Sequence, residues 1–302
     1  MISTARDSNA IMPNHRILIT GASGQLGGYL LEQLRGSSDH IIAWSSAGRQ
    51  ERFGTLLQPV DLTNADQVAR CFDEAKPNLV LHAAALSSIA ACYQAPERAE
   101  KINHLGTAQL AELASRSKAR LLYVSTDLVF DGEKGNYREE DEARPLSIYA
   151  RTKLAGEKAA LAIDSSLVVR VSLLLGPSHQ AERPNFFDQQ RRTLLTGQSI
   201  SCFADEWRTP LTHRWAARML LNLLAEWEGT GLLHLSGPER LSRLDIGQRL
   251  ALRLGVSQEK VVPIAQAAVA TPEPRPRDTS LNSGLWRRMF SSEPWPIWDG
   301  EW

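Results

Sequence analysis

Tyr149 and Lys153 stand four residues apart in the run Tyr149-Ala150-Arg151-Thr152-Lys153, which opens a stretch of helical character. Residues four apart share one face of a helix, about one turn from each other. A phenol with an ordinary pKa of about 10 exchanges protons poorly near neutral pH. A cation beside it favours the phenolate and lowers that pKa toward the working range. The pair therefore predicts a proton donor for a carbonyl oxygen, if a hydride donor binds nearby.

A second polar group, Ser125-Thr126-Asp127, ends the apolar run Leu121-Leu122-Tyr123-Val124. A short apolar run of this kind is typical of a buried strand. A hydroxyl at the end of this strand, beside the predicted helix, would hold the same carbonyl oxygen as the tyrosine. The two groups together predict the proton-delivery apparatus of a reductase.

A glycine-rich turn follows the first strand-forming run, Arg16–Thr20. It reads Gly21-Ala22-Ser23-Gly24-Gln25-Leu26-Gly27 and leads into a helix-forming segment. Strand, glycine turn and helix in this order form the context in which a glycine motif indicates dinucleotide binding. The glycines allow the tight turn, the approach of backbone to a pyrophosphate and the close packing of the helix, whose N-terminus favours an anion. We expect this loop to hold the pyrophosphate of a dinucleotide cofactor.

The end of the next predicted strand bears on which cofactor is bound. Ile41–Trp44 is followed by Ser45-Ser46-Ala47-Gly48-Arg49, and no acidic residue occurs between Ile41 and Gln50. A carboxylate at this place binds the 2′-hydroxyl of the adenosine ribose, whereas small hydroxyls and an arginine accept a 2′-phosphate. Ser45, Ser46 and Arg49 therefore favour NADPH over NADH. The alternative for each of them is a solvated loop position.

Strands and helices alternate with short connections over residues 15–175. This alternation predicts an α/β fold, a Rossmann-type doubly wound parallel sheet, with ligands beyond the carboxyl ends of its strands. Shorter elements over residues 176–302 predict a small C-terminal substrate-binding lobe that does not fold independently. Residues 1–14 are expected to be a disordered leader. The tryptophans at 295, 298 and 302 would dock on the body or on a second copy in a homodimer, and both arrangements remain open.

Composition narrows the class of protein. The chain has 302 residues, and its 34 lysines and arginines balance its 34 acidic residues, so no net field favours nucleic acid. No apolar run approaches the length of a membrane span. Cys71, Cys92 and Cys202 fall in no metal-ligand spacing, and we expect reduced thiols, no metal site and a cytoplasmic protein.

Taken together, TGASGQLG, STDLVFDG, YARTK and GEK resemble the extended short-chain dehydrogenase/reductase superfamily. With RTPLT at 208–212 and RPRDTSLN at 275–282, the chain looks most like the dTDP-4-dehydrorhamnose reductase family. This resemblance implies NAD(P)H-dependent reduction of a 4-keto sugar attached to a nucleoside diphosphate. It also implies that Tyr149 protonates the ketone oxygen, while Lys153 lowers the pKa of the tyrosine and holds the nicotinamide ribose. Thr126 would bind the same oxygen, with Ser125 as the alternative.

The resemblance further implies a set of binding residues. For the cofactor these are the pyrophosphate-lining residues Gly21, Ser23, Gly24, Gln25, Leu26 and Gly27, the adenine-side residues Asp61 and Leu62, and the ribose-side residues Ala83, Ala84 and Ala85. For the nucleotide-sugar they are Ser125, Asp127, Asn185, Trp207 and Arg208. The guanidinium fork of Arg208 would suit a diphosphate.

The chain departs from the family pattern at one stretch. Rhamnose reductases usually carry an aromatic and an acidic residue after the Ala-Ala strand end, and residues 84–90 here contain neither. The identity of the sugar is therefore left open. The alternatives are a nucleotide-sugar epimerase and an NADP-binding regulatory subunit resembling the beta subunit of methionine adenosyltransferase. A dehydratase is disfavoured because Leu128, not a second acid, follows Asp127.

Overall fold

The computed structural model of the protein describes residues 15–290. The leader expected at 1–14 and the tryptophans at 295, 298 and 302 lie outside the described residues. Among the described residues, no helix is long and apolar enough to pass through a membrane. The same residues contain no cluster of histidine, cysteine and acidic side chains that would hold a metal ion.

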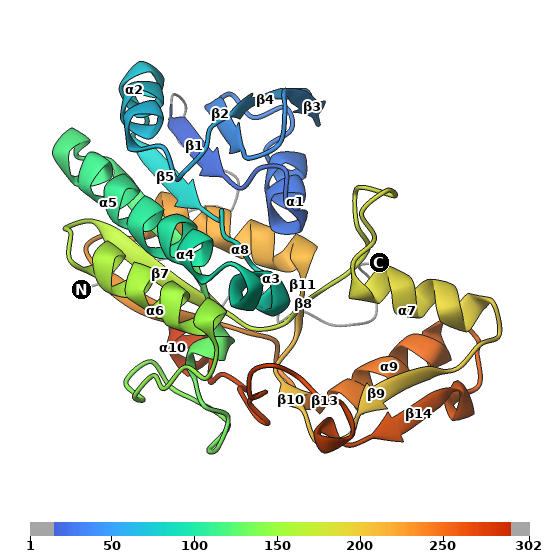
Figure 1. Cartoon of the computed structure of the whole chain (residues 1–302). Helices are drawn as coiled ribbons and strands as arrows, with labels where there is room; N and C mark the ends of the chain where they lie inside the picture. The colour runs from blue at the N-terminus through green and yellow to red at the C-terminus, as the bar shows by residue number, and fades with distance from the viewer. Residues whose placement is uncertain (1–14, 291–302) are drawn as a thin grey trace.

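An eight-stranded sheet forms the centre of the molecule (Figure 1), and all its neighbouring strands are parallel except the β3–β4 pair. Its strands have the bulky apolar runs that a parallel sheet needs when both of its faces are covered. In spatial order they are β12 (Gly231–Leu235), β7 (Ser166–Val171), β6 (Arg120–Thr126), β5 (Leu79–His82), β1 (Arg16–Thr20), β2 (His40–Ser45), β4 (Thr55–Pro59) and β3 (Gln50–Arg52). The order places the glycine turn after β1 beside the ends of β2 and β5.

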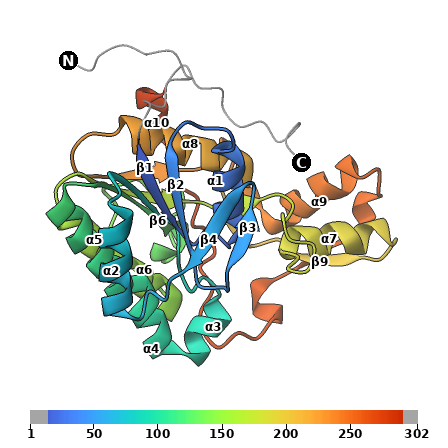
Figure 2. The ribbon, with the colours of Figure 1, turned by 90° about the horizontal axis from the view of Figure 1, so that it is seen from above.

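Helices cover both faces of the sheet (Figure 2). One face carries α2 (Ala65–Ala75), α5 (Gly106–Ser117) and α6 (Ile148–Leu161), together with α3 (Ile89–Gln94) and α4 (Pro96–Ala99). The other carries α1 (Gln25–Gln33), α8 (His213–Glu226) and α10 (Gly284–Met289). A π-helical turn, η1 (Glu100–Leu105), joins α4 to α5, and the 3-10 turn η2 (Asp127–Val129) follows β6.

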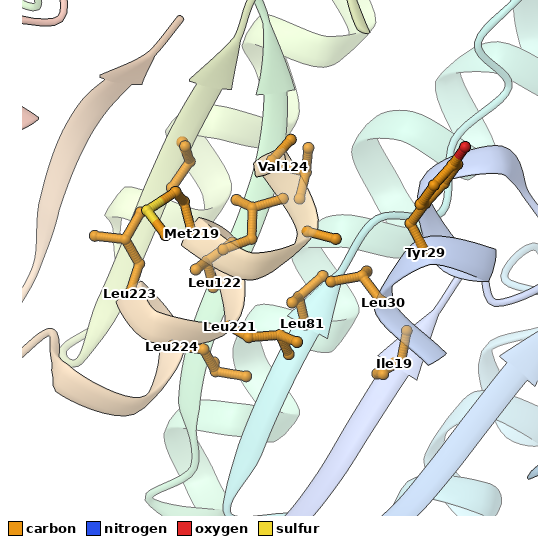
Figure 3. Packing of buried hydrophobic residues seen from close by; sticks show 14 of the residues in the cluster. Ile19, Tyr29, Leu30, Leu81, Leu122, Val124, Met219, Leu221, Leu223 and Leu224 are labelled. Atoms are coloured by element: carbon orange, nitrogen blue, oxygen red, sulfur yellow. The ribbon is translucent and has the colours of Figure 1, made fainter. Parts of the chain in front are cut away.

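Each face of the sheet has its own hydrophobic core. On the α8 side, Met219, Leu223 and Leu224 pack with Leu81 and Leu122 of the strands (Figure 3). On the other side, residues of α2 and α5 pack against the opposite faces of the same strands. Alternate strand residues therefore belong to different cores, which follows from the two-residue period of a strand.

A smaller group of elements lies to one side of the sheet (Figure 1) and forms the lobe. It comprises α7 (Phe186–Leu195), β9 (Ile200–Phe203), α9 (Arg243–Arg253) and β14 (Val261–Ile264), with the turns η3 (Gln258–Lys260) and η4 (Gln266–Ala268). Two short pairs join it to the body: β8 (Leu174–Leu175) with β11 (Leu211–Thr212), and β10 (Trp207–Arg208) with β13 (Leu241–Ser242).

The division expected at residue 175 differs from this arrangement. Within 176–302, α8 packs on α1 and β12 adds to the sheet beside β7. The apolar residues of β12 pack into both cores. The chain thus leaves the sheet after β7, forms part of the lobe and returns to the sheet at β12. The lobe is therefore made of two separate segments rather than of everything after residue 175.

A buried ion pair lies between α6 and the sheet. Arg170 of β7 donates to both carboxylate oxygens of Glu157, with an Nη2–Oε2 distance of 2.7 Å, and both side chains are at most 5% exposed. Glu157 also accepts a hydrogen bond from the Ser125 hydroxyl at 2.5 Å. The pair thus ties α6 to the strand that carries Ser125.

Replacing one partner of this pair should unfold the protein more easily. Arg170→Met leaves the Glu157 carboxylate without its cation, and we expect a loss of about 3–5 kcal/mol in the free energy of unfolding. The double variant Glu157→Gln/Arg170→Met should regain most of that loss, because no uncompensated charge remains. Urea titration measures both, with the exposed Arg116→Ala as the control. A single-variant cost below 1 kcal/mol would contradict the assignment.

Candidate active site

Tyr149 lies in the first turn of α6, close to the end of β6. The helix begins after Ser147, whose hydroxyl caps it by accepting from the Ala150 amide. The Thr126 side chain lies close enough to the Tyr149 phenol to lower the pKa of that phenol. It packs in a small apolar cluster with Cys92 and Ala99. Two hydroxyls from different elements therefore lie near each other.

The structure distinguishes between the two hydroxyls that the sequence offered on β6. Ser125 donates to Glu157, so its hydroxyl faces the buried ion pair. The Thr126 hydroxyl lies near the Tyr149 phenol and donates to Asp127 Oδ1 at 3.2 Å. Thr126 is thus the hydroxyl that is placed to share a substrate oxygen with Tyr149.

The contacts of Lys153 differ from those that its spacing from Tyr149 suggested. Its Nζ donates to the carbonyl of Val124 at 2.7 Å and lies 4.0 Å from the centre of the Tyr123 ring. Burial lowers the pKa of Lys153 to about 7, and the Glu157 carboxylate opposes this shift. The ammonium is one turn from Tyr149 and close to the strand end.

The pKa of Tyr149 therefore differs from the expectation. Burial raises the pKa of this phenol above its usual value, and the charge of Asp127 adds to the rise. Only the Thr126 side chain acts in the opposite direction. The arrangement keeps Tyr149 in its protonated form, as a proton donor requires.

The glycine turn has the close packing that a phosphate loop needs. Gly21 has a φ of +72°, and a Cβ on it would lie 2.7 Å from the backbone nitrogen of Ala84. A Cβ on Gly27 would meet the backbone of Ala22 at 2.7 Å. The helix that follows, α1, has neither a capping side chain nor an acidic residue in its first turn. Its N-terminal N–H groups and partial positive charge suit a pyrophosphate.

The other expected residues of the loop lie around this turn. Ser23 and Leu26 are half-buried, and Gly24 is exposed with its amide bonded to the Gly21 carbonyl. The Gln25 side chain instead reaches the lobe, where its Nε2 donates to Ser178 Oγ at 2.7 Å. Gln25 therefore connects the cofactor-side helix with the chain that leads into α7.

The adenosine side contains one residue that the sequence reasoning missed. Ser45 is buried and bonds the backbone of Ala47, whereas Ser46 and Arg49 are exposed. Arg52, on β3, instead lies against the glycine turn, where its Nη1 donates to the carbonyls of Ala22 and Gly24, each at 3.2 Å. β3 turns back on β4, so Arg52 reaches the loop across about thirty residues of sequence. The signal that could have revealed the place of Arg52 is the short antiparallel pair of β3 and β4 that follows β2.

The remaining cofactor-side positions lie at neighbouring strand ends. Asp61 is exposed and accepts from the amide and hydroxyl of Thr63, while Leu62 packs into the core. Ala83, Ala84 and Ala85 follow β5 and are half-buried, and the Ala84 amide donates to Thr20 Oγ1. Their small side chains leave room along this edge of the sheet.

Asn103 positions the loop that follows these alanines. It lies in the π-helical turn η1 and is fully buried. Its Oδ1 accepts from the Leu86 amide at 2.8 Å, and its Nδ2 donates to the Leu86 carbonyl and to Thr152 of α6. The loop after β5 is thereby fixed to the catalytic helix.

On the substrate side, Arg208 has a different setting from the one expected. It is 5% exposed, and its Nε lies 3.5 Å from Asp127 Oδ2. Its other nitrogens approach Glu206 and the carbonyls of Trp207, Pro276 and Arg277. Its donors are directed at protein acceptors, so it is not placed to bind a diphosphate.

Asp127, Asn185 and Trp207 are also tied into the protein. Asp127 is buried between Thr126, Thr279 and Arg208, and burial raises the pKa of its carboxyl. Asn185 caps α7 and donates to the Gly176 carbonyl. Trp207 is half-buried, and the guanidinium of Arg240 lies 4.5 Å from its ring centre. Asn185 thus begins α7 of the lobe and Trp207 lies on β10, while Asp127 directly follows β6.

Comparison with known proteins identifies the family. A family model described as the RmlD substrate binding domain matches residues 15–299. The chain belongs to this family. The match covers both the sheet and the lobe, so the similarity includes the cofactor side as well as the substrate side.

Individual relatives cover almost the whole chain. The dTDP-4-dehydrorhamnose reductase of Aggregatibacter actinomycetemcomitans is 30% identical, over 92% of this chain and 94% of its own length. Methionine adenosyltransferase 2 subunit beta of Bos taurus is 28% identical, over 90% and 81%. The solved structure of dTDP-4-dehydrorhamnose reductase from Bacillus anthracis in complex with NADP is 25% identical, with a TM-score of 0.82 over 94% of this chain and 96% of that one.

The buried ammonium of Lys153 should make stability depend on pH. A lysine in the unfolded chain titrates near about 10.4. The folded group titrates at about 7, so between these values the unfolded state binds more protons and stability rises with pH. Lys153→Met should remove this rise, which approaches about 1.4 kcal/mol per pH unit. Urea titrations of both proteins at pH 7.5 and 9.5 measure it, and equal slopes would contradict the placement of Lys153.

Proposed function

We propose that the protein is an NADPH-preferring reductase of a 4-keto sugar attached to a nucleoside diphosphate. The observation that carries the proposal is that Thr126, at the end of β6, and Tyr149, in the first turn of α6, lie near each other at the sheet edge that also holds the glycine turn. Family membership and the reductases among the relatives support the same reading. The proposal includes the attachment of the sugar to a nucleotide and the position of its keto group.

The bound nicotinamide supplies the hydride that reduces the keto carbon. Tyr149 donates its phenolic proton to the keto oxygen, and the Thr126 hydroxyl turns its single proton from Asp127 Oδ1 to the same oxygen. Burial keeps the phenol protonated until this step. Lys153, one helical turn away, stabilises the phenolate that remains and donates hydrogen bonds to the nicotinamide ribose. This division of roles follows the general rule that a catalytic acid must lie within hydrogen-bond reach of the atom it protonates.

The residues around the glycine turn would hold the cofactor. The pyrophosphate fits against the N-terminus of α1, and Arg52 extends from β3 over the same loop. Arg52 is half-buried and presents a guanidinium, which suits the 2′-phosphate of NADPH. Arg49 is exposed. We assign phosphate recognition chiefly to Arg52, because its guanidinium contacts the glycine turn.

The diphosphate of the nucleotide-sugar needs a cation other than Arg208. Arg275 and Arg277 are exposed and lie on the chain segment that runs beside Trp207 and Asp127. The Arg277 guanidinium is 5.9 Å from the ring centre of Trp207. We assign the diphosphate to these two side chains, with Trp207 beside them.

Tyr149→Phe should remove at least 99% of turnover and leave NADPH affinity within about twofold. The phenol is the only proton donor that the proposal assigns to the oxygen, and general acid catalysis is worth about 10²–10⁴-fold. Turnover is measured as NADPH oxidation with dTDP-4-keto-6-deoxy sugars, and affinity by fluorescence titration. Unchanged turnover would refute the assigned role.

The same assay separates this proposal from the alternative of a non-catalytic subunit that resembles methionine adenosyltransferase 2 subunit beta. Tight NADP binding without turnover on any nucleotide-sugar would overturn the enzyme assignment. Epimerisation without net NADPH oxidation would instead identify an epimerase.

Arg52→Ala should weaken NADPH binding by about tenfold or more and change NADH binding much less. A charged hydrogen bond to a phosphate contributes about 1.5–3 kcal/mol, and NADH lacks that phosphate. Arg49→Ala is the matched control and should shift both affinities by less than about twofold. Equal losses for NADPH and NADH in Arg52→Ala would contradict recognition of the 2′-phosphate.

A further inference from the structure

Residues 271–281, here called the strap, connect the lobe with the body. In Figure 1 the chain passes from β14 in the lobe toward α10, which packs near β12. Along this path the strap contacts both elements that carry the catalytic hydroxyls. The contacts come from two side chains, Glu273 and Thr279.

Glu273 contacts the start of the catalytic helix. Its side chain is buried, and Oε1 accepts a hydrogen bond from the Ile148 amide at 2.8 Å. Ile148 is the first residue of α6 and immediately precedes Tyr149. Arg151, in the same turn, lies 3.5 Å from this oxygen. A carboxylate at a helix N-terminus binds free N–H groups and opposes the partial positive charge there.

The second carboxylate oxygen of Glu273 is unusual. Oε2 is buried and has no hydrogen-bond partner among the described residues. Burying an unpaired carboxylate oxygen reduces stability. A contribution to folding is therefore a poor explanation for an acid at this place, whereas a contribution to the placement of α6 is consistent with its one strong contact.

Thr279 contacts the chain beside the second hydroxyl, that of Thr126. It is fully buried, and its hydroxyl donates to Asp127 Oδ2 at 2.8 Å. The opposite oxygen of Asp127 accepts from Thr126. The strap backbone is fixed nearby, because the Leu281 amide donates to Thr209 Oγ1 and the Asp278 amide donates to the Gly132 carbonyl.

We propose that Glu273 and Thr279 are positioning residues, and that the strap sets the relative placement of Tyr149 and Thr126. This inference rests on the proposed function of that hydroxyl pair. The two hydroxyls belong to separate elements, α6 and the end of β6, and both must reach one oxygen atom. A misplacement of about 1 Å costs roughly 100-fold in rate. One rigid segment that holds both elements keeps the error below that distance.

Two matched pairs of variants test the proposal. Thr279→Val removes the hydrogen bond to Asp127 at nearly constant volume, and Thr279→Ser retains it. Glu273→Ala removes the acceptor for Ile148, and Glu273→Gln retains an amide oxygen in its place. We expect kcat to fall at least tenfold in Thr279→Val and Glu273→Ala, and to stay within about threefold in the two conservative variants. NADPH affinity should remain within twofold in all four, and the exposed Glu259→Gln in the lobe serves as control.

The combined variant Glu273→Ala/Thr279→Val shows whether the two residues affect kcat through the same placement of the two hydroxyls. If both act through one placement, the double variant loses less than the product of the single losses. Unchanged kcat in both single variants would overturn the proposal. Equal losses in Thr279→Val and Thr279→Ser, or losses that follow the fraction of unfolded protein, would overturn it as well.

Hydrogen exchange gives a readout that does not depend on turnover. We expect faster exchange of the amides at 148–152 in Glu273→Ala and at 127–129 in Thr279→Val, with the rest of the sheet unchanged. If the parent protein turns over no nucleotide-sugar, the proposed function fails, and this exchange pattern still decides the role of the strap. Unchanged exchange in both segments would show that the strap does not hold them.

Discussion

A parallel sheet that is covered on both faces can hold a polar side chain only where a partner is supplied. Three buried polar groups in this sheet follow that rule. His82 lies between the hydroxyls of Thr20 and Thr107, and burial lowers its pKa to about 3, so it remains neutral. Arg170 binds Glu157, and Glu157 in turn binds Ser125. These partners account for the side chains of His82, Arg170 and Ser125. The Thr126 hydroxyl, at the end of β6, instead donates to Asp127 and lies near Tyr149.

The same rule explains how much of the site the sequence could reveal. Local patterns placed Tyr149, Lys153, Thr126 and the glycine turn at one sheet edge, because each motif adjoins its own strand or helix. Arg52 and Arg208 could not be assigned in this way. The role of Arg52 depends on β3 folding back over a turn far away in sequence, and that of Arg208 depends on carboxylates at two other places in the chain. Contacts between residues far apart in the sequence decide which arginines are available to bind a ligand. The spacing of residues along the chain does not reveal these contacts.

The electrostatic expectation for the catalytic pair was incomplete for a related reason. Spacing shows that Lys153 and Tyr149 share a helix face, but it does not show how far that face is buried from solvent. Desolvation acts on both groups and shifts their pKa values in opposite directions, toward a neutral amine and a neutral phenol. The domain division failed similarly, because β12 carries the same apolar pattern whether it joins the large sheet or a separate lobe.

The strap also has a consequence for the way the protein is made. Strands β1 to β7 of the sheet and the glycine turn are complete by residue 171. Glu273 and Thr279 follow more than a hundred residues after Tyr149. A growing chain can therefore form the glycine turn and the strands beside it well before the strap aligns the Thr126 and Tyr149 hydroxyls. If the strap acts as we propose, a chain that lacks it would turn over substrate more slowly while its cofactor side is already formed, which separates binding from reactivity during synthesis.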